Sequence, residues 1–130
     1  MNILFIDDSP FRWHKLQSRL DQNTCTWVQS ADEAIAAMQD GQFDLVMIDH
    51  DLADAHYESD CDDNTTGTGI ARWIVKHQDK FRRSVFVAHT LNPDGAARIQ
   101  FILAQAGFHC ERIPFGWEKI NLNSLAKAMG

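Results

Sequence analysis

The stretch from Phe43 to Leu52 reads FDLVMIDHDL, and it decides how the rest of the chain is interpreted. Its apolar run ends in two carboxylates, Asp49 and Asp51, on either side of His50. An ionised Asp is almost never fully buried without a partner, because removing water from a charge costs roughly several kcal/mol or more. The stretch therefore predicts a buried strand whose end carries charged groups that need a partner.

Short apolar runs recur along the chain, and a helix-like segment follows each of them. The predicted strands are Ile3 to Ile6, Cys25 to Val28, Phe43 to Ile48, Val85 to Ala88 and Phe108 to Ile113. The first and third runs are almost uninterruptedly apolar, which is typical of parallel strands covered by helices on both faces. The alternation predicts a single doubly wound α/β domain over residues 1–130, a (βα)5 flavodoxin-like fold with a parallel five-stranded sheet in the order 2-1-3-4-5.

The boundaries of several helices are also encoded locally. The predicted N-cap residues are Ser9, Ser30 and Asn92. Gly41 and Gly107 fall where a glycine in the left-handed conformation would end the second and fourth helices. A final helix is expected over about Glu118 to Met129.

Composition narrows the classes of partner. The chain has 18 acidic and 12 basic side chains, a formal net charge of −6, which argues against general affinity for nucleic acid or anionic lipid. A local basic patch can still hold one phosphate, and the expected partners are small ligands and proteins. The chain shows no signal peptide and no run of about 18 apolar residues, and its three scattered cysteines predict reduced thiols. We therefore expect a cytoplasmic protein.

Acidic residues follow both the first and the third predicted strands. Asp7 and Asp8 end the first, while Asp49 and Asp51 end the third. In this strand order the two ends meet at the point where ligands bind in open parallel sheets. Such carboxylates repel one another unless a hard cation lies among them, so the sequence predicts Mg²⁺ or Mn²⁺. In the alternative interpretation Asp8 caps the first helix, Asp51 is solvated, and only Asp49 is unusual.

Polar residues also follow the fourth strand, at the same edge. His89 and Thr90 come directly after it, and a histidine there can donate to phosphate, ligate a metal or transfer a proton. Taken alone, a histidine at a strand end is more often a surface or packing residue. The helix that opens at Asn92 presents free backbone N–H groups that favour an anion, with Arg98 nearby. Plain capping by Asn92 and a solvated Arg98 explain these two residues equally well.

A long acidic segment separates the third strand from its helix. The residues between Asp51 and Gly67 include five acidic side chains and no Lys or Arg. Loops of this length in compact domains are usually functional or disordered. We expect Ala53 to Thr66 to be mobile without ligand and to act as a lid or a specificity loop.

The acid pair, the Asp after the third strand and the hydroxyl after the fourth make the whole chain resemble a response-regulator receiver domain. The resemblance implies that Asp7, Asp8 and Asp49 hold Mg²⁺ and that Asp49 accepts a phosphoryl group. The chain departs from receivers at Ile113, because they carry a Lys before the proline that follows the fifth strand. That Lys pairs with the phosphoryl group, so its absence argues against a signalling receiver.

At these departures the sequence is similar to one branch of receivers, the cyclic-phosphate processing receiver-like domains. The shared motifs are DHDL at Asp49 to Leu52, HTLNPDGAA at His89 to Ala97 and RIPFGW at Arg112 to Trp117. The resemblance implies a site in which Asp49, His89 and Thr90 do the chemistry. The predicted ligand-binding residues are His50, Asn92 and Arg98, and the predicted metal ligands are Asp7, Asp8, Asp49 and Asp51.

Three functions fit these residues. The first is a Mg²⁺- or Mn²⁺-dependent phosphoesterase that hydrolyses a cyclic or terminal phosphate of a nucleotide or RNA end. In that reaction His89 protonates the leaving oxygen, while water or Asp49 attacks. The second is a receiver module phosphorylated on Asp49. The third is a noncatalytic binder of a phosphorylated ligand.

Overall fold

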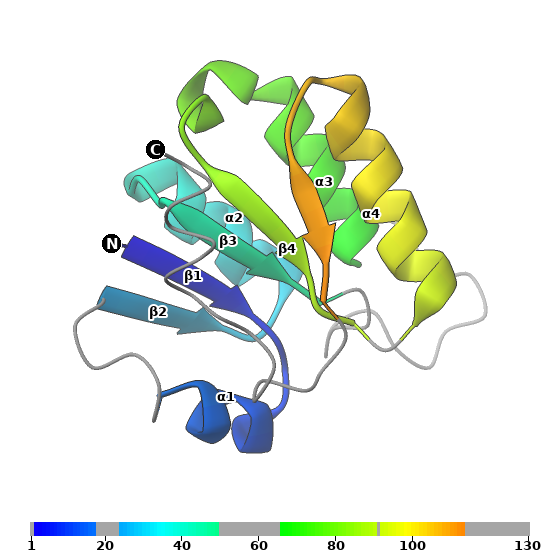
Figure 1. The fold of residues 1–130 in the computed structure, drawn as a ribbon. Helices are drawn as coiled ribbons and strands as arrows, with labels where there is room; N and C mark the ends of the chain where they lie inside the picture. Colours follow the sequence, from blue (N-terminus) through cyan, green and yellow to red (C-terminus); the bar gives the residue numbers. More distant parts are fainter. Residues whose placement is uncertain (1, 18–23, 50–65, 91, 114–130) are drawn as a thin grey trace.

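The computed structural model describes residues 2–17, 24–49, 66–90 and 92–113. Strands and helices alternate along these ranges (Figure 1). The elements are β1 (Asn2–Ile6), α1 (Pro10–Gln17), β2 (Thr24–Val28), α2 (Ala31–Asp40), β3 (Leu45–Ile48), α3 (Gly67–Lys76), the 3-10 helix η2 (Gln78–Phe81), β4 (Val85–Ala88), α4 (Pro93–Gln105) and β5 (Cys110–Arg112).

The strands form one parallel sheet in the order β2-β1-β3-β4-β5, which confirms the predicted topology. All five arrows in Figure 1 point the same way, so the carboxyl ends of β1, β3 and β4 lie at one edge. The chain order reverses between β1 and β3, and ligands of open α/β sheets bind at such a point. The sheet therefore brings the polar residues that follow β1 and β3 together.

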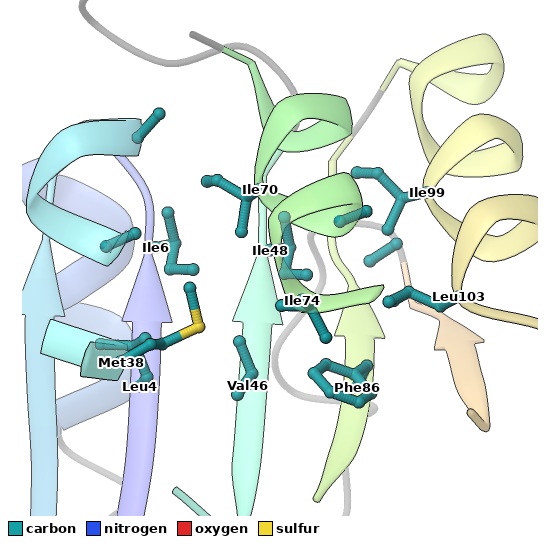
Figure 2. Packing of buried hydrophobic residues seen from close by; sticks show 14 of the residues in the cluster. Leu4, Ile6, Met38, Val46, Ile48, Ile70, Ile74, Phe86, Ile99 and Leu103 are labelled. Atoms are coloured by element: carbon teal, nitrogen blue, oxygen red, sulfur yellow. The ribbon is translucent and has the colours of Figure 1, made fainter. Parts of the chain in front are cut away.

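Each face of the sheet carries its own apolar cluster, because successive strand residues point to opposite faces. The larger cluster packs the sheet against α2, α3 and α4, and Figure 2 shows Met38, Ile70 and Leu103 of these helices beside the strand residues Leu4, Ile48 and Phe86, respectively. The smaller cluster lies on the other face, under α1. It contains Ile3, Phe5, Leu16, Leu45, Met47, Val85 and Val87. The face covered by α1 is the one that matters for the site.

Local signals set the helix boundaries largely as predicted. The hydroxyl of Ser30 accepts from the Glu33 N–H at 3.1 Å, the Asn92 side chain accepts from the Gly95 N–H at 3.1 Å, and the Ser9 hydroxyl accepts from the Arg12 N–H at 3.3 Å. Such N-caps typically contribute about 1 kcal/mol each. The first turns of α1, α2 and α4 are therefore held by side chains close to them in sequence.

The two predicted glycine stops have different outcomes. Gly107 has φ +86° and follows α4 in the left-handed conformation, as expected. Gly41 does end α2, and its N–H donates to the Ala37 carbonyl at 3.0 Å, but its φ of −134° is extended. The prediction of a left-handed Gly41 is wrong, since the chain leaves α2 straight towards β3 and needs no positive φ there.

Two predicted features lie outside the described residues: the final helix at Glu118 to Met129 and nearly all of the acidic segment from Ala53 to Thr66. Thr66, the last residue of that segment, is buried and is the N-cap residue of α3. None of the helices in the described ranges has the length and apolar character that a membrane crossing needs.

Candidate metal centre at the carboxyl edge of the sheet

Strand register places three predicted site residues side by side. Asp7, Asp49 and His89 are the first residues after β1, β3 and β4, and their N–H groups continue the ladder of hydrogen bonds. The Asp49 N–H donates to the Ile6 carbonyl at 3.0 Å, and the His89 N–H donates to the Ile48 carbonyl at 3.1 Å. Because side chains alternate along a strand, all three point to the face covered by α1.

We call these three side chains the edge cluster. One ligand atom from each of Asp7, Asp49 and His89 lies within 4.8 Å of the others. Nε2 of His89 is 3.0 Å from Oδ2 of Asp7. The three residues are almost fully buried, with exposed fractions of 0%, 4% and 1%. The cluster therefore holds two carboxylates and an imidazole out of water, where each interaction between charges is strengthened.

Asp7 is the most heavily contacted member. Its Oδ1 accepts from the Ser9 N–H at 2.8 Å and its backbone carbonyl accepts from the Trp27 indole N–H at 2.7 Å. Burial alone would raise the pKa of Asp7, but hydrogen bonds from His89 and Arg12, together with the charge of His89 and the Ser9 N–H, outweigh burial and lower this pKa. Asp7 is therefore held as a carboxylate.

The pKa of Asp49 is shifted in the opposite direction to that of Asp7. Burial raises the pKa of Asp49 to about 6, and the neighbouring negative charge of Asp7 adds to this rise. The positive charges of His89 and Arg12 and a hydrogen bond from the Thr90 side chain act against it without cancelling it. The edge cluster is thus short of positive charge around Asp49, and a divalent cation would supply what is missing.

Arg12 is a site residue that the sequence reasoning missed. Its Nε lies 2.6 Å from Asp7 Oδ2, and one terminal nitrogen lies 2.8 Å from Asp7 Oδ1. The guanidinium therefore donates two parallel hydrogen bonds to this carboxylate. The same terminal nitrogen is 3.5 Å from Asp49 Oδ2 and 3.8 Å from Asp8 Oδ1. A signal was present, because Arg12 is a cation in the first turn of α1, where the helix dipole disfavours positive charge.

Aromatic stacking fixes the imidazole of His89. Its ring stacks on Phe5 with a centroid distance of 5.0 Å, and Phe5 in turn stacks on Trp13 at 6.1 Å. Trp13 stacks on Trp27 at 5.5 Å, and both indoles pack against the apolar cluster beside the site. The aromatic column limits rotation of His89 and keeps Nε2 directed at Asp7.

The other predicted residues lie around the edge cluster or beyond it. Thr90 is buried beside Asp49, and its hydroxyl also accepts from the Asn92 N–H at 3.1 Å. Asp8 is partly exposed, with its side chain 35% accessible. Arg98 is exposed on α4, and no contact between it and the edge cluster is seen within the described residues. His50 and Asp51 lie outside the described residues.

The fifth strand brings an apolar residue to the edge. The Ile113 N–H donates to the Ala88 carbonyl at 3.0 Å, which continues the pairing of β4 with β5. Its side chain packs against the apolar cluster under α1. The position at which receivers carry a Lys is therefore occupied here by a packing residue.

The donor set of the edge cluster fits a divalent cation. Carboxylate oxygens suit Mg²⁺ and Mn²⁺, and an imidazole nitrogen suits transition metals. Burial and the neighbouring Asp7 charge raise the pKa of Asp49, so a bound cation would favour its ionised form.

Solved structures with a similar fold are receiver domains. The response regulator TrrA of Thermotoga maritima, in complex with Mg²⁺-BeF, has a TM-score of 0.69 and 17% identity, covering 99% of this chain and 98% of that one. The non-phosphorylated HemR receiver domain of Leptospira biflexa has a TM-score of 0.67 and 23% identity, covering 99% and 94%. At these identities the likeness shows the fold alone.

Sequence comparisons narrow the relationship further. A search of curated protein sequences gave no match. The family model described as the cyclic-phosphate processing receiver domain matches residues 2–105, a range that contains β1 to α4 and all three residues of the edge cluster. Since this match spans most of the chain, the protein belongs to the cyclic-phosphate processing receiver domain family.

Proposed function

We propose that this protein is a metal-dependent phosphoesterase that hydrolyses a cyclic or terminal phosphate of a nucleotide or an RNA end. The observation that carries the proposal is the edge cluster, in which ligand atoms of Asp7, Asp49 and His89 lie within 4.8 Å of one another. Membership of the cyclic-phosphate processing family supports the choice of substrate class. We also propose that the protein is cytoplasmic, as the sequence led us to expect.

The proposed metal ligands are Asp7 and Asp49, with Asp8 at the exposed side, and the proposed ion is Mg²⁺ or Mn²⁺. Asp51 is a further candidate that lies outside the described residues. When bound, such a cation draws negative charge off the phosphate oxygens and stabilises the charge that develops in the transition state. The remaining chemistry falls to the protein's own side chains.

His89 is the proposed proton donor. Its Nε2 faces the carboxylates, with Asp7 Oδ2 at 3.0 Å, so a substrate oxygen held among them lies within reach of this nitrogen. In hydrolysis a water oxygen bonds to phosphorus, and the bond from phosphorus to one ribose oxygen breaks. The ribose oxygen keeps the electron pair and takes a proton from Nε2, while the proton that water loses passes to Asp49.

Other residues have supporting roles in this proposal. Thr90 donates a hydrogen bond to Asp49 and so orients its carboxylate. Asn92 is the N-cap residue of α4, and its side chain accepts a hydrogen bond from the Gly95 N–H. Ligand binding by Asn92, Arg98 and His50 stays a prediction, with the first turn of α4 as the place for a phosphate oxygen.

The test is a panel of 2′,3′-cyclic nucleotides, cyclic dinucleotides and terminal phosphates, incubated with the protein and Mn²⁺, Mg²⁺ or EDTA. We expect metal-dependent release of a phosphomonoester or free phosphate from at least one substrate, lost in Asp49→Asn. Asp79→Asn is the matched control, because Asp79 is exposed at the opposite end of the sheet, pairs with Arg82 and loses the same charge on substitution. Saturable binding of a substrate without cleavage would instead indicate a noncatalytic binder.

A further inference from the structure

The guanidinium of Arg12 lies where a cation would have to bind. It holds both oxygens of Asp7, at 2.6 and 2.8 Å, and reaches towards Asp49 at 3.5 Å and Asp8 at 3.8 Å. One side chain thus contacts all three carboxylates that are the described candidates for metal ligands. A positive charge in this place does part of what a metal ion does, since it offsets the repulsion among the acids.

Arg12 also stands on the solvent side of the buried acids. The side chains of Asp7 and Asp49 are 0% and 6% exposed, whereas those of Arg12 and Asp8 are 24% and 35% exposed. An ion or phosphate that approaches from this side meets the guanidinium before it reaches the edge cluster. Arg12 is therefore placed to control access to Asp7 and Asp49.

The oxygens of Asp7 are fully engaged. A carboxylate offers about four lone-pair sites. Oδ1 accepts from the Ser9 N–H and from Arg12, while Oδ2 contacts Arg12 and His89. A cation can take an Asp7 oxygen only if one of these partners leaves. The Ser9 N–H belongs to the backbone and His89 is buried and stacked, so the longer and more exposed Arg12 side chain is the one that moves.

Once it has left Asp7, the guanidinium of Arg12 could bind a phosphate at the same site. Its planar fork matches two oxygens of a phosphate as well as it matches two oxygens of a carboxylate. Ile113, the first residue after β5, packs against the apolar cluster under α1 and brings no charge to this face. The helix that carries Arg12 begins only three residues after Asp7, which keeps the guanidinium within reach of any phosphate bound at the cluster.

We propose that Arg12 is a resident counter-ion that a divalent cation displaces from Asp7, and that the displaced guanidinium then binds the phosphate of the substrate. This inference rests on the proposed function, because it assumes that the edge cluster binds metal. In it Arg12 sets metal affinity and couples metal binding to phosphate binding.

The experiment measures Mn²⁺ affinity by calorimetry in the parent protein, Arg12→Gln, Arg12→Lys and the control Arg82→Gln. Removing the competing guanidinium should tighten Mn²⁺ binding of Arg12→Gln by roughly ten- to a hundredfold. Arg12→Lys cannot hold both Asp7 oxygens, so it should fall between the parent and Arg12→Gln, and it serves if Arg12→Gln folds poorly. Arg82→Gln should match the parent, which separates competition at the site from a change in net charge.

The second measurement is the affinity for inorganic phosphate at saturating Mn²⁺. We expect Arg12→Gln to bind phosphate at least tenfold more weakly than the parent, although it binds Mn²⁺ more tightly. Opposite shifts in the two affinities are a result that simple loss of structure would not give. Unchanged phosphate affinity in Arg12→Gln would overturn the phosphate role.

The outcomes separate this inference from the proposed function. If the parent binds Mn²⁺ and Arg12→Gln binds it no more tightly, Arg12 is not a competitor and the inference fails while the metal centre stands. If Arg12→Gln binds Mn²⁺ and the parent does not, the inference is supported in its strongest form. If neither protein binds Mn²⁺, both the inference and the metal centre are wrong.

Discussion

Nε2 of His89 lies 3.0 Å from Oδ2 of Asp7, and both side chains are almost completely buried. The two residues are 82 positions apart in the sequence, and the contact joins the end of β4 to the end of β1 across β3. Removing one partner of a buried hydrogen-bonded pair usually costs more than the pair itself contributes, because the other partner is left buried without compensation. The pair therefore links the stability of the sheet edge to its chemistry.

The first prediction concerns His89. His89→Ala should lower the free energy of unfolding by about 3 kcal/mol, because it leaves Asp7 short of a partner and removes the ring that stacks on Phe5. His89→Gln keeps a side-chain N–H that can donate to Asp7, so its free energy of unfolding should fall by about half as much as that of His89→Ala. Chemical denaturation measures both values.

The two His89 variants also separate structure from catalysis. Neither alanine nor glutamine can supply a proton to a leaving oxygen, so both should cleave substrate roughly 10²- to 10⁴-fold more slowly than the parent, without a loss of Mn²⁺ affinity. Cleavage by His89→Gln at the parent's rate would show that His89 is only a structural partner of Asp7.

The second prediction concerns the pH dependence of stability in the metal-free protein. The pKa of Asp49 is raised from 3.8 to about 6, so the folded state favours its neutral form. The cost of ionising Asp49 is absent below about pH 4, grows as the pH rises and is complete above about pH 6. Asp49→Asn should therefore be more stable than the parent at pH 7.5, by up to about 3 kcal/mol, and close to it at pH 4.

Thermal or denaturant unfolding at several pH values in EDTA measures this difference. Asp7 works in the opposite direction, since its lowered pKa gives stability that is lost as the pH falls through its folded value, and this residue is the same in both proteins. A constant difference between Asp49→Asn and the parent from pH 4 to pH 7.5 would contradict the prediction.

The third prediction compares two glycines. Gly107 has φ +86°, a conformation that strains any residue with a Cβ, so Gly107→Ala should lower the free energy of unfolding by about 1 kcal/mol. At Gly41 a Cβ would meet the Ala37 carbonyl at 3.4 Å and the Phe43 ring at 3.6 Å, which are ordinary contacts, and φ is extended. Gly41→Ala should therefore leave the free energy of unfolding unchanged or slightly increased. Equal losses in the two variants would show that Gly41 is constrained in some other way.

The fourth prediction separates the phosphoesterase from a signalling receiver. Acetyl phosphate with Mg²⁺ would add about 80 Da to a protein that phosphorylates itself on an aspartate. We expect no stable adduct, because Ile113 packs against the apolar cluster and offers no charge to pair with a phosphoryl group on Asp49. A stable adduct that disappears in Asp49→Asn, together with no cleavage of any cyclic phosphate, would make the protein a receiver.

The fold and much of the edge cluster could be predicted because their signals are local. Apolar runs such as Leu45–Ile48 mark strands, and Asp7, Asp49 and His89 each follow a strand directly. Once parallel strands are in register, residues that follow them become neighbours without further information. The order of the strands then decides which polar residues meet.

Other features depend on how side chains and backbone settle in three dimensions. The reach of Arg12 from α1 back to Asp7 depends on its rotamer and on the docking of the helix, and its only sequence signal was a cation at a helix N-terminus. The extended conformation of Gly41 could not be read from its residue type, because glycine adopts either sign of φ. The opposite pKa shifts of Asp7 and Asp49 likewise follow from burial and contacts.

The most direct test of the metal centre is a calorimetric titration of Mn²⁺ into the metal-free protein and into Asp49→Asn, with Asp79→Asn as the control. The edge cluster predicts one saturable site in the parent and in Asp79→Asn, and an affinity at least tenfold weaker in Asp49→Asn, because a neutral amide replaces a buried carboxylate ligand. The metal centre would be contradicted if Asp49→Asn bound Mn²⁺ as tightly as the parent does. It would also be contradicted if neither the parent nor Arg12→Gln showed saturable binding at millimolar Mn²⁺.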